Sequence, residues 1–447
     1  MEIFIKLSQF LLSLSLLIIL HELGHFIPAK LFKTRVEKFY LFFDVKFSLL
    51  KKKIGETEYG IGWLPLGGYV KISGMIDESM DKEQMALPPQ PWEFRSKPAW
   101  QRIIIMLGGV TVNFVLAFLI YIGIAYAYGD LNLKNSELKD GIAVTSELGE
   151  KLGFKSGDKI ISINDEKIIN FNDVPTKLLF GKKVVVERNG AQQTIVFPID
   201  LIGQIVSNKK AKLISIRQPF MVGKVVDSSV NKAVLLPKDV IKSINGEPTK
   251  YFDEVVTIVT ANKNKTLTAV VVRDKKDVAI TLKVDMNGKL GIEGAGYDYK
   301  SLEKLGFYKF EKKEYGFFES IPVGLTKGKE QLFGYFDQLK AIFSPQTGAY
   351  KGVGGFYAIF SIFPPVWSWE IFWGITAILS IMLGVVNLLP IPALDGGHVM
   401  FLLYEMISGK KPSDKFLENA QIVGFVILIS LVLFSNGNDI FKGIFGK

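Results

Sequence analysis

Four stretches of the chain are apolar over nearly the length needed to span a lipid bilayer. They cover residues 3–26, 103–128, 371–394 and a weaker fourth stretch, whose strict core is 422–434 but which extends over 417–441. A transmembrane helix needs about 20 predominantly apolar residues, so the pattern predicts four membrane spans. The first stretch lacks a basic leading region and a small-residue cleavage site, and we interpret it as a retained span rather than a signal peptide.

The pattern changes between the second and third predicted spans. From about residue 129 to residue 315, short β-rich runs such as 183–187 alternate with Gly, Asn and Asp, which predicts a folded extramembrane region. The run DKIISINDE at 158–166 aligns with DVIKSINGE at 239–247. This internal repeat predicts two copies of one small β-domain. The repeated pattern resembles the strand pair that opens the core of PDZ domains, although the second copy lacks the glycine that matches Gly157.

Two further segments have recognisable periodicity. An amphipathic helix is predicted before the third span and ends by Pro345; its apolar positions are Leu325, Leu332, Phe336, Leu339 and Phe343. This helix either packs on the β-domains or lies on the outer leaflet, and the adjacent span favours the leaflet. Residues 39–47 and 59–72 alternate apolar and polar positions around turn residues 51–58, which predicts a β-hairpin or small sheet. It either dips toward the membrane or is an ordinary cytoplasmic hairpin.

Composition agrees with a membrane protein and restricts the chemistry. The 447 residues have 48% hydrophobic and 22% charged side chains, and the mean hydropathy is +0.26. Cysteine is absent, so thiol nucleophiles, disulfides and cysteine metal sites are excluded. The net charge is +10, and its basic residues flank the predicted spans in a way that the positive-inside rule explains without nucleic acid. The flanking residues are Lys30, Lys33, Arg35, Lys38, Arg95, Lys97, Arg102, Lys410, Lys411 and Lys415.

The candidate chemistry lies at the end of the first span. His21 and His25 are four residues apart on a predicted helix, so both rings can hold one metal ion, and Glu22 beside them can activate water. A hydrolytic zinc site needs a third protein ligand, for which His398 and Asp395 are candidates. Asp395 is favoured because the first and third spans both run inward, which places all three side chains near the cytoplasmic face. Pro390 and Pro392 interrupt that helix, as expected of a chain lining a cavity.

These motifs, in their order, resemble the site-2 protease family of intramembrane zinc proteases, and more narrowly the bacterial branch called regulator of sigma-E protease. The matching segments are HELGH at 21–25, PLGGYVK at 65–71, FRSKPAWQR at 94–102 with Gly108, Gly109 and Asn113, and LDG at 394–396. The resemblance implies that His21, His25 and Asp395 bind one Zn²⁺ ion, that Glu22 is the general base, and that Asn387 helps to hold the substrate backbone. His398 would be a bystander.

The resemblance also implies a cellular location, a class of substrates and a role for the PDZ-like domains. We expect an endopeptidase of the bacterial inner membrane that cuts transmembrane segments of single-span regulatory proteins, such as an anti-sigma factor already clipped by a site-1 protease, or leftover signal peptides. The PDZ-like pair would exclude substrates with bulky outer domains; the alternative is peptide capture, although residues 141–144 and 221–224 do not form the usual carboxylate-binding loop. Residues 36–74 resemble the family's membrane-re-entrant β element, but Phe42, Phe43 and Asp44 replace glycines.

The expected fold is a multi-pass α-helical membrane protein with about four transmembrane helices, a membrane-associated β-hairpin or sheet, and an extracytoplasmic tandem of PDZ-like α+β domains. A catalytically inactive membrane scaffold and a zinc transporter or sensor remain alternatives. The expected segments are span one at 1–30, the β region at 31–102, span two at 103–128, PDZ-like domains at 129–213 and 214–296, a connector at 297–370, span three at 371–397, a cytoplasmic loop at 398–416 and span four at 417–441.

Overall fold

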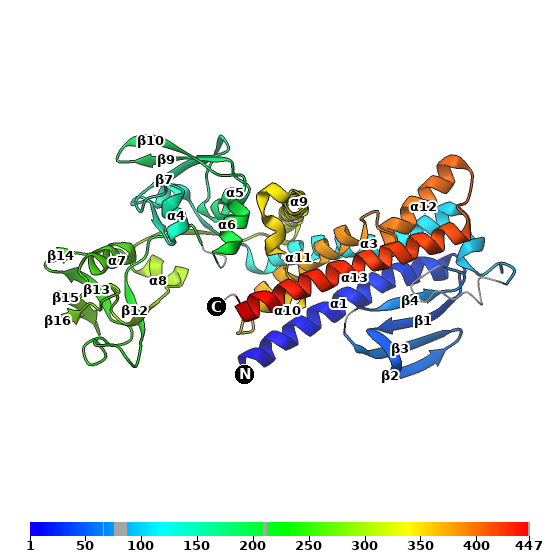
Figure 1. Ribbon diagram of the computed structural model, residues 1–447, viewed down its shortest axis with the longest axis horizontal. Coiled ribbons are helices and arrows are strands. Elements are labelled where there is room, and N and C mark those ends of the chain that lie inside the picture. Colours follow the sequence, from blue (N-terminus) through cyan, green and yellow to red (C-terminus); the bar gives the residue numbers. More distant parts are fainter. Residues whose placement is uncertain (66, 76–86, 209–211, 446–447) are drawn as a thin grey trace. The chain divides into compact units, whose positions relative to one another are not determined.

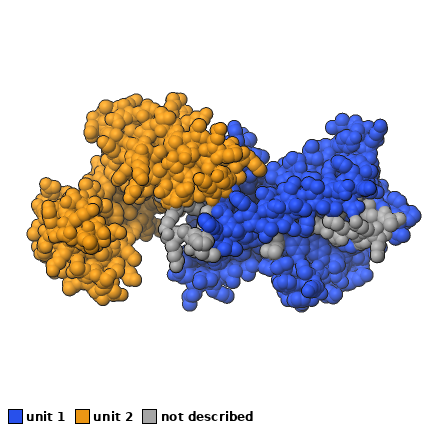
Figure 2. Space-filling view, in the orientation of Figure 1, with its two compact units in different colours: residues 1–129, 314–340, 353–447 blue, residues 130–313, 341–352 orange. Residues whose placement is uncertain are grey.

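The computed structural model describes residues 1–65, 67–75, 87–208 and 212–445 (Figure 1). Leu66 and residues 76–86 of the predicted β region, and residues 209–211 of the first predicted β-domain, lie outside the described residues. The chain divides into two compact units, coloured separately in Figure 2. Unit 1 comprises Met1–Gly129, Glu314–Lys340 and Val353–Lys447, and unit 2 comprises Asp130–Lys313 and Ala341–Gly352.

Unit 1 contains the four predicted apolar helices. In the described part of the chain, four helices are long and apolar enough to cross a membrane: α1 (Glu2–Leu31), α3 (Ala99–Tyr128), α11 (Trp369–Asn387) and α13 (Asp414–Phe445). Each coincides with one of the apolar stretches in the sequence. Unit 1 also contains the shorter helices α10 (Phe356–Ser361) and α12 (Asp395–Ser408).

The third apolar helix is shorter than predicted. We expected the third span over 371–397, interrupted at Pro390 and Pro392, and a loop over 398–416; α11 ends at Asn387 and a new helix, α12, begins at Asp395. Pro390 and Pro392 account for the break, because proline has no N–H to donate and clashes with the preceding helical turn. The predicted interruption is present, whereas the segment 398–416, predicted as a loop, is largely helical because α12 runs to Ser408 and α13 begins at Asp414.

Glycines bring α1 and α3 close together. A Cβ atom on Gly24 would collide with the carbonyl oxygen of Gly108, and a Cβ on Gly108 would collide with the carbonyl oxygen of Gly24. Small residues of this kind allow helix backbones to approach closely in membranes. Helix α11 packs on the other part of α3, where Ala117 and Tyr121 share a buried cluster with Ala377 and Ile381. Helix α11 also contacts α1, since the hydroxyls of Thr376 and Ser13 lie 2.9 Å apart.

A four-stranded sheet follows α1. Its strands are β1 (Val36–Leu41), β2 (Phe43–Ile54), β3 (Thr57–Leu64) and β4 (Tyr69–Ile72), in the order β2-β3-β1-β4. The predicted turn at 51–58 is too long, because Lys53 pairs with Glu58 and Ile54 with Thr57, leaving Gly55 and Glu56 as the turn. Strand β4 lies at the edge of the sheet and pairs only with β1 among the described strands.

Unit 2 contains two β-domains with separate hydrophobic cores. The repeat found in the sequence is visible in both: Asp158 receives two hydrogen bonds from Arg188, and Asp239 receives the same pair from Arg273. The first domain contains β6 (Ile142–Val144), α4 (Glu147–Lys151), β7 (Lys159–Ile163), β8 (Glu166–Lys167), α5 (Val174–Leu179), β9 (Lys183–Arg188), β10 (Ala191–Val196), α6 (Leu201–Ser207) and β11 (Ile214–Ile216). The second contains β12 (Met221–Val225), β13 (Val240–Ile244), β14 (Glu247–Pro248), α7 (Phe252–Ala261), β15 (Thr266–Arg273), β16 (Lys276–Lys283) and β17 (Ile292–Ala295).

Two predicted boundaries shift in unit 2. Strand β11 pairs with β6, so the first domain extends past residue 213. The beginning of the predicted connector also belongs here: β18 (Phe310–Lys313) pairs with β5 (Asp130–Leu133), and Leu302 of α8 (Tyr299–Lys304) is buried in the first core. Sequence periodicity could not show these pairings, because each joins strands that are far apart in the chain.

The predicted amphipathic helix is present as α9 (Phe317–Ile342). Its small residues face α3, since a Cβ on Gly324 would collide with Ile122 and one on Gly328 with Phe118. Leu332, Tyr335 and Leu339 pack on the cluster formed by α3 and α11. The helix therefore packs on the apolar helices of unit 1; its contact with a lipid leaflet stays a prediction.

Candidate metal centre

Three predicted ligands meet at one point in unit 1. His21 and His25 lie one turn apart on α1, and Asp395 is the first residue of α12. The Nε2 atoms of the two histidines are 3.3 Å apart, and each lies 3.4 Å from Oδ2 of Asp395. The three atoms thus form a nearly equilateral triangle. Both imidazoles are buried, with 8% and 7% of His21 and His25 exposed.

The geometry of this triangle fits a zinc ion. Tetrahedral zinc binds His nitrogen and carboxylate oxygen at about 2.0–2.2 Å, which separates neighbouring ligand atoms by about 3.3–3.6 Å. Oδ2 of Asp395 is buried and has no hydrogen-bond partner, although an isolated buried carboxylate oxygen is unfavourable. A cation held by these three atoms would satisfy that oxygen, and three protein ligands are the set typical of a catalytic zinc site.

The backbone of α3 orients His25. The Nδ1 atom of His25 lies 2.8 Å from the carbonyl oxygen of Ile105. A carbonyl oxygen can only accept, so Nδ1 carries the proton and donates it, and the Nε2 lone pair is directed at the triangle. The close approach requires a glycine on α3, because a Cβ atom on Gly109 would collide with Nε2 of His25 and would lie 2.7 Å from Cε1 of His21.

Asn113 plays the corresponding part for His21. Its side-chain amide lies 3.0 Å from Nδ1 of His21, and its Oδ1 is buried without a partner as the amide is placed. Oxygen and nitrogen of an amide are assigned from their hydrogen bonds rather than seen. If His21 binds a metal through Nε2, then Nδ1 carries the proton, and the amide turned by 180° provides its acceptor. The turned amide also gives Oδ1 the partner it lacks.

A cavity of about 510 Å³ opens beside the triangle. Glu22, which we predicted as the general base, is half-buried and lines this cavity together with His21, His25 and Asp395. Asn387, at the end of α11, has Nδ2 3.3 Å from Nε2 of His21, so it lies directly beside the triangle. His398 lines the same cavity but is not one of the three clustered ligands. The sequence-predicted residues are therefore brought together.

Two polar residues near the centre were missed as site residues. Asn113 appeared only as part of a motif, and Gln421 of α13, which also lines the cavity, was not considered. A signal existed for both, since a polar side chain within an apolar span usually has a specific partner in the helix bundle. That signal cannot identify the partner, because the partners are 92 and 28 residues away in the sequence.

Comparison with known proteins shows the family of this chain. A model of peptidase family M50 matches residues 9–431. The chain belongs to peptidase family M50. M50 is the site-2 protease family of metalloproteases, so the family predicted from the motifs is confirmed.

Several M50 relatives align over nearly their whole length and are each named "putative zinc metalloprotease". The relative from Rickettsia conorii is 26% identical over 98% of both chains, that from Fusobacterium nucleatum 28% over 96% of both, and that from Neisseria meningitidis 25% over 97% of this chain and 98% of its own. A PDZ domain of an SdrC-like protein from Listeria monocytogenes is similar to 21% of this chain, and 97% of that domain is covered, with 21% identity and a TM-score of 0.16.

Proposed function

We propose that this M50 metalloprotease is a zinc-dependent intramembrane endopeptidase that cleaves transmembrane segments of regulatory membrane proteins. The observation that carries the proposal is the triangle of His21, His25 and Asp395, which opens into a cavity lined by Glu22 and whose two histidines lie on a helix long enough to span a bilayer. One zinc ion fits this triangle by its ligand spacing and by the unpaired oxygen of Asp395.

When bound, the ion supplies Lewis-acid polarisation of the attacking water and of the scissile carbonyl. Residues of the chain transfer the proton, orient the metal ligands and bind the substrate backbone. Glu22 takes a proton from the attacking water and returns it to the leaving nitrogen as general base and then general acid. The carbonyl of Ile105 and the amide of Asn113 hold the two imidazoles in the required tautomers. Asn387, beside the triangle, is placed to donate a hydrogen bond to the substrate backbone.

Strand β4 is a suitable surface on which to hold the substrate. A transmembrane helix hides its peptide bonds in internal hydrogen bonds, so it must be held in an extended form to be cut. Gly68, Tyr69, Val70, Lys71 and Ile72 line the same cavity as Glu22, and β4 is an edge strand. An extended substrate segment that pairs with the side of β4 that no described strand occupies would pass beside the candidate metal centre.

The setting of the reaction follows from the basic residues and from the resemblance of the motifs. We place the enzyme in the bacterial cytoplasmic membrane, with unit 2 outside and the metal centre toward the cytoplasm. The substrates would be single-span proteins such as an anti-sigma factor already trimmed by a site-1 protease, with remnant signal peptides as a second class. The two PDZ-like domains would act as a size filter that excludes proteins with bulky outer domains.

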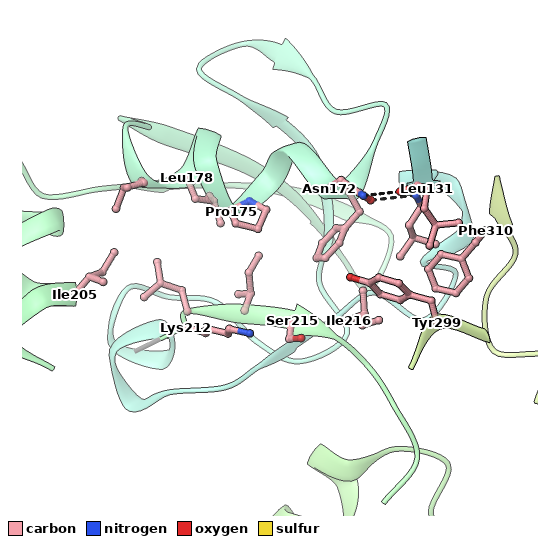
Figure 3. Close-up of a pocket in the computed structure, with 15 residues that line it drawn as sticks. Leu131, Asn172, Pro175, Leu178, Ile205, Lys212, Ser215, Ile216, Tyr299 and Phe310 are labelled. Atoms are coloured by element: carbon pink, nitrogen blue, oxygen red, sulfur yellow. Dashed lines mark hydrogen bonds between the residues drawn. The ribbon is translucent and has the colours of Figure 1, made fainter. Parts of the chain in front are cut away.

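A cavity in the first β-domain favours a second role for that domain. It measures about 430 Å³ and lies between α5 and β11 (Figure 3). Pro175 and Leu178 of the helix face Ser215 and Ile216 of the strand, and Tyr299 and Phe310 lie at one end of the cavity. Because β11 pairs only with β6 among the described strands, an extended apolar peptide could add to its other side. The predicted loop position 141–144 does not line this cavity.

Cleavage of a single-span membrane peptide by the purified full chain tests the proposed function. We expect cleavage that requires Glu22, since removing a general base costs about 10²–10⁴-fold in rate, and that stops when a chelator removes the metal. Glu22→Gln should still bind zinc. Full activity of Glu22→Gln would contradict the hydrolase. An inactive scaffold would bind the peptide without cutting it, and a transporter would move zinc into vesicles whether or not peptide is present.

A further inference from the structure

The loop that carries Asp395 contains a strained residue. Ala393, two residues before Asp395, has φ +83°, a left-handed conformation that residues with a Cβ rarely adopt. Such a conformation persists only where the surrounding structure holds it. Oδ2 of Asp395 does not hold the loop in place, because this atom has no hydrogen-bond partner in the protein. The position of this carboxylate therefore depends on how the preceding loop is held.

Helix α13 holds the loop at two positions one helical turn apart. Oε1 of Gln421 accepts a hydrogen bond of 3.1 Å from the backbone N–H of Ala393. Gly424 packs against Pro392 so closely that a Cβ atom there would collide with the Pro392 carbonyl oxygen. Gln421 is only 4% exposed, and it lines the cavity that contains His21, His25 and Asp395.

These two contacts stand out on an otherwise exposed helix. Among the residues of α13 whose burial is described, Gln421 and Gly424 are the buried ones. The apolar side chains around them, such as Ile422, Val423 and Phe425, are exposed in the chain by itself and are suited to lipid. A buried amide on such a helix is unfavourable unless its hydrogen bond has a purpose, and here its partner is the strained residue beside a candidate metal ligand.

We propose that Gln421 is a positioning residue for the metal centre: it pins Ala393 in its strained conformation and so places Asp395 against His21 and His25. The proposal rests on the proposed function, because it assumes that these three residues bind zinc. It adds a consequence for the fourth span. Zinc affinity depends on the docking of α13 on the 388–394 loop, so any movement of α13 away from the loop loosens the third ligand.

The test measures zinc affinity of the full chain in detergent or nanodiscs by competition with a chromogenic chelator, independently of cleavage. Gln421→Met keeps the side-chain length and removes the acceptor, and we expect affinity about 10–100-fold weaker, as for other residues that orient metal ligands. Gln421→Glu keeps an acceptor oxygen and should retain affinity near that of the unmodified chain. Asn419→Leu alters an exposed position on the same helix and should change nothing.

A substitution at Ala393 tests whether Gln421 acts on Asp395 through the conformation of Ala393. Glycine adopts a positive φ without strain, so Ala393→Gly should leave the affinity unchanged and should restore most of it to the Gln421→Met chain. The proposal is overturned if Gln421→Met binds zinc as tightly as the unmodified chain, or if Ala393→Gly gives no recovery. Failure of the unmodified chain to bind one zinc would instead refute the proposed function. If Gln421→Met does not fold, weak binding by Gln421→Glu in a folded chain would equally overturn the proposal.

Discussion

We expect the side chain of Asn113 to affect the metal affinity of the whole centre. Its side-chain amide lies 3.0 Å from Nδ1 of His21, and its backbone carbonyl oxygen accepts a hydrogen bond of 2.8 Å from the Ser380 hydroxyl. The acceptor on Nδ1 decides which tautomer His21 adopts and therefore whether Nε2 can bind a cation. The Ser380 hydrogen bond links the backbone of α3 at Asn113 to α11.

We predict that Asn113→Leu weakens zinc binding about 10–100-fold, since it removes the acceptor from Nδ1 while retaining similar volume. Asn113→Asp should bind nearly as tightly, because a carboxylate is a common partner of metal-binding histidine. Chelator competition on the purified chain measures both. Equal loss in the two variants would show that Asn113 acts through packing and not through its acceptor.

In unit 2, the buried carboxylate of Asp239 supports the second β-domain. Only 1% of its side chain is exposed, and it accepts hydrogen bonds of 2.8 and 2.7 Å from Arg273 and one of 2.9 Å from the Leu236 N–H. Asp239→Asn should destabilise this domain by about 2–3 kcal/mol, as expected for loss of charge-assisted hydrogen bonds. Hydrogen exchange of β13 and β15 in the full chain measures the effect. Asp227→Asn, which alters a 90% exposed side chain, is the control and should have little effect.

The carboxylate of Asp239 should also make the stability of the second β-domain depend on pH. Burial tends to raise the pKa of Asp239, but the hydrogen bonds from Arg273 and Leu236 outweigh it and hold the pKa below its ordinary value. The folded pKa is therefore lower than the unfolded one, so the stabilisation is complete above about pH 5 and is lost as the pH falls through the folded pKa. Hydrogen exchange of β13, corrected for intrinsic rates, should accelerate in acid more steeply in the unmodified chain than in Asp239→Asn. If the exchange rate depended equally on pH in the two chains, the predicted role of the Asp239 carboxylate would be contradicted.

At the scale of the helices, glycines decide whether the ligands can meet. Gly24 and Gly108 are in backbone contact where α1 crosses α3, and Gly24 directly precedes His25. We predict that Gly24→Ala separates the helices, lowers thermal stability and weakens zinc binding at least about 10-fold, because the added methyl meets backbone atoms that cannot move aside. Gly123→Ala on α3 has open space around its Cβ and serves as the matched control. If both variants behave alike, close helix packing is not what assembles the site.

The sequence was informative where a signal is local. The four apolar helices, the repeat, and the pairing of His21 with His25 follow from spacing along one element, and the structure contains them. The end of α11 required the positions of Pro390 and Pro392 to be weighed more strongly than the apolar run. Partners distant in the chain, such as Gln421 with Ala393 or β11 with β6, depend on tertiary packing, which periodicity does not encode.

On the scale of whole domains, a size filter requires that its two domains keep a defined spacing. Within unit 2, Asp140 of the first domain accepts hydrogen bonds from Lys250 at 2.6 Å and from the Tyr251 hydroxyl at 2.5 Å. The Arg217 guanidinium lies 4.0 Å from the centre of the Tyr251 ring and pairs with Asp253. The hydrogen bonds from Lys250 and Tyr251 lower the pKa of Asp140, so this junction stays charged at neutral pH. These contacts join the two β-domains directly.

We also predict on which side of the membrane the β-domains and the segment after α12 lie. Because the chain has no cysteine, single cysteines report accessibility without background. We expect an impermeant maleimide to label Lys155→Cys and Lys263→Cys, at exposed positions of the two β-domains, in intact spheroplasts. Lys410→Cys and Lys415→Cys, which follow α12, should react only after permeabilisation, because the basic residues there are retained inside. Labelling of all four from one side would mean that α3 and α11 do not both cross the membrane, and the proposed topology would be wrong.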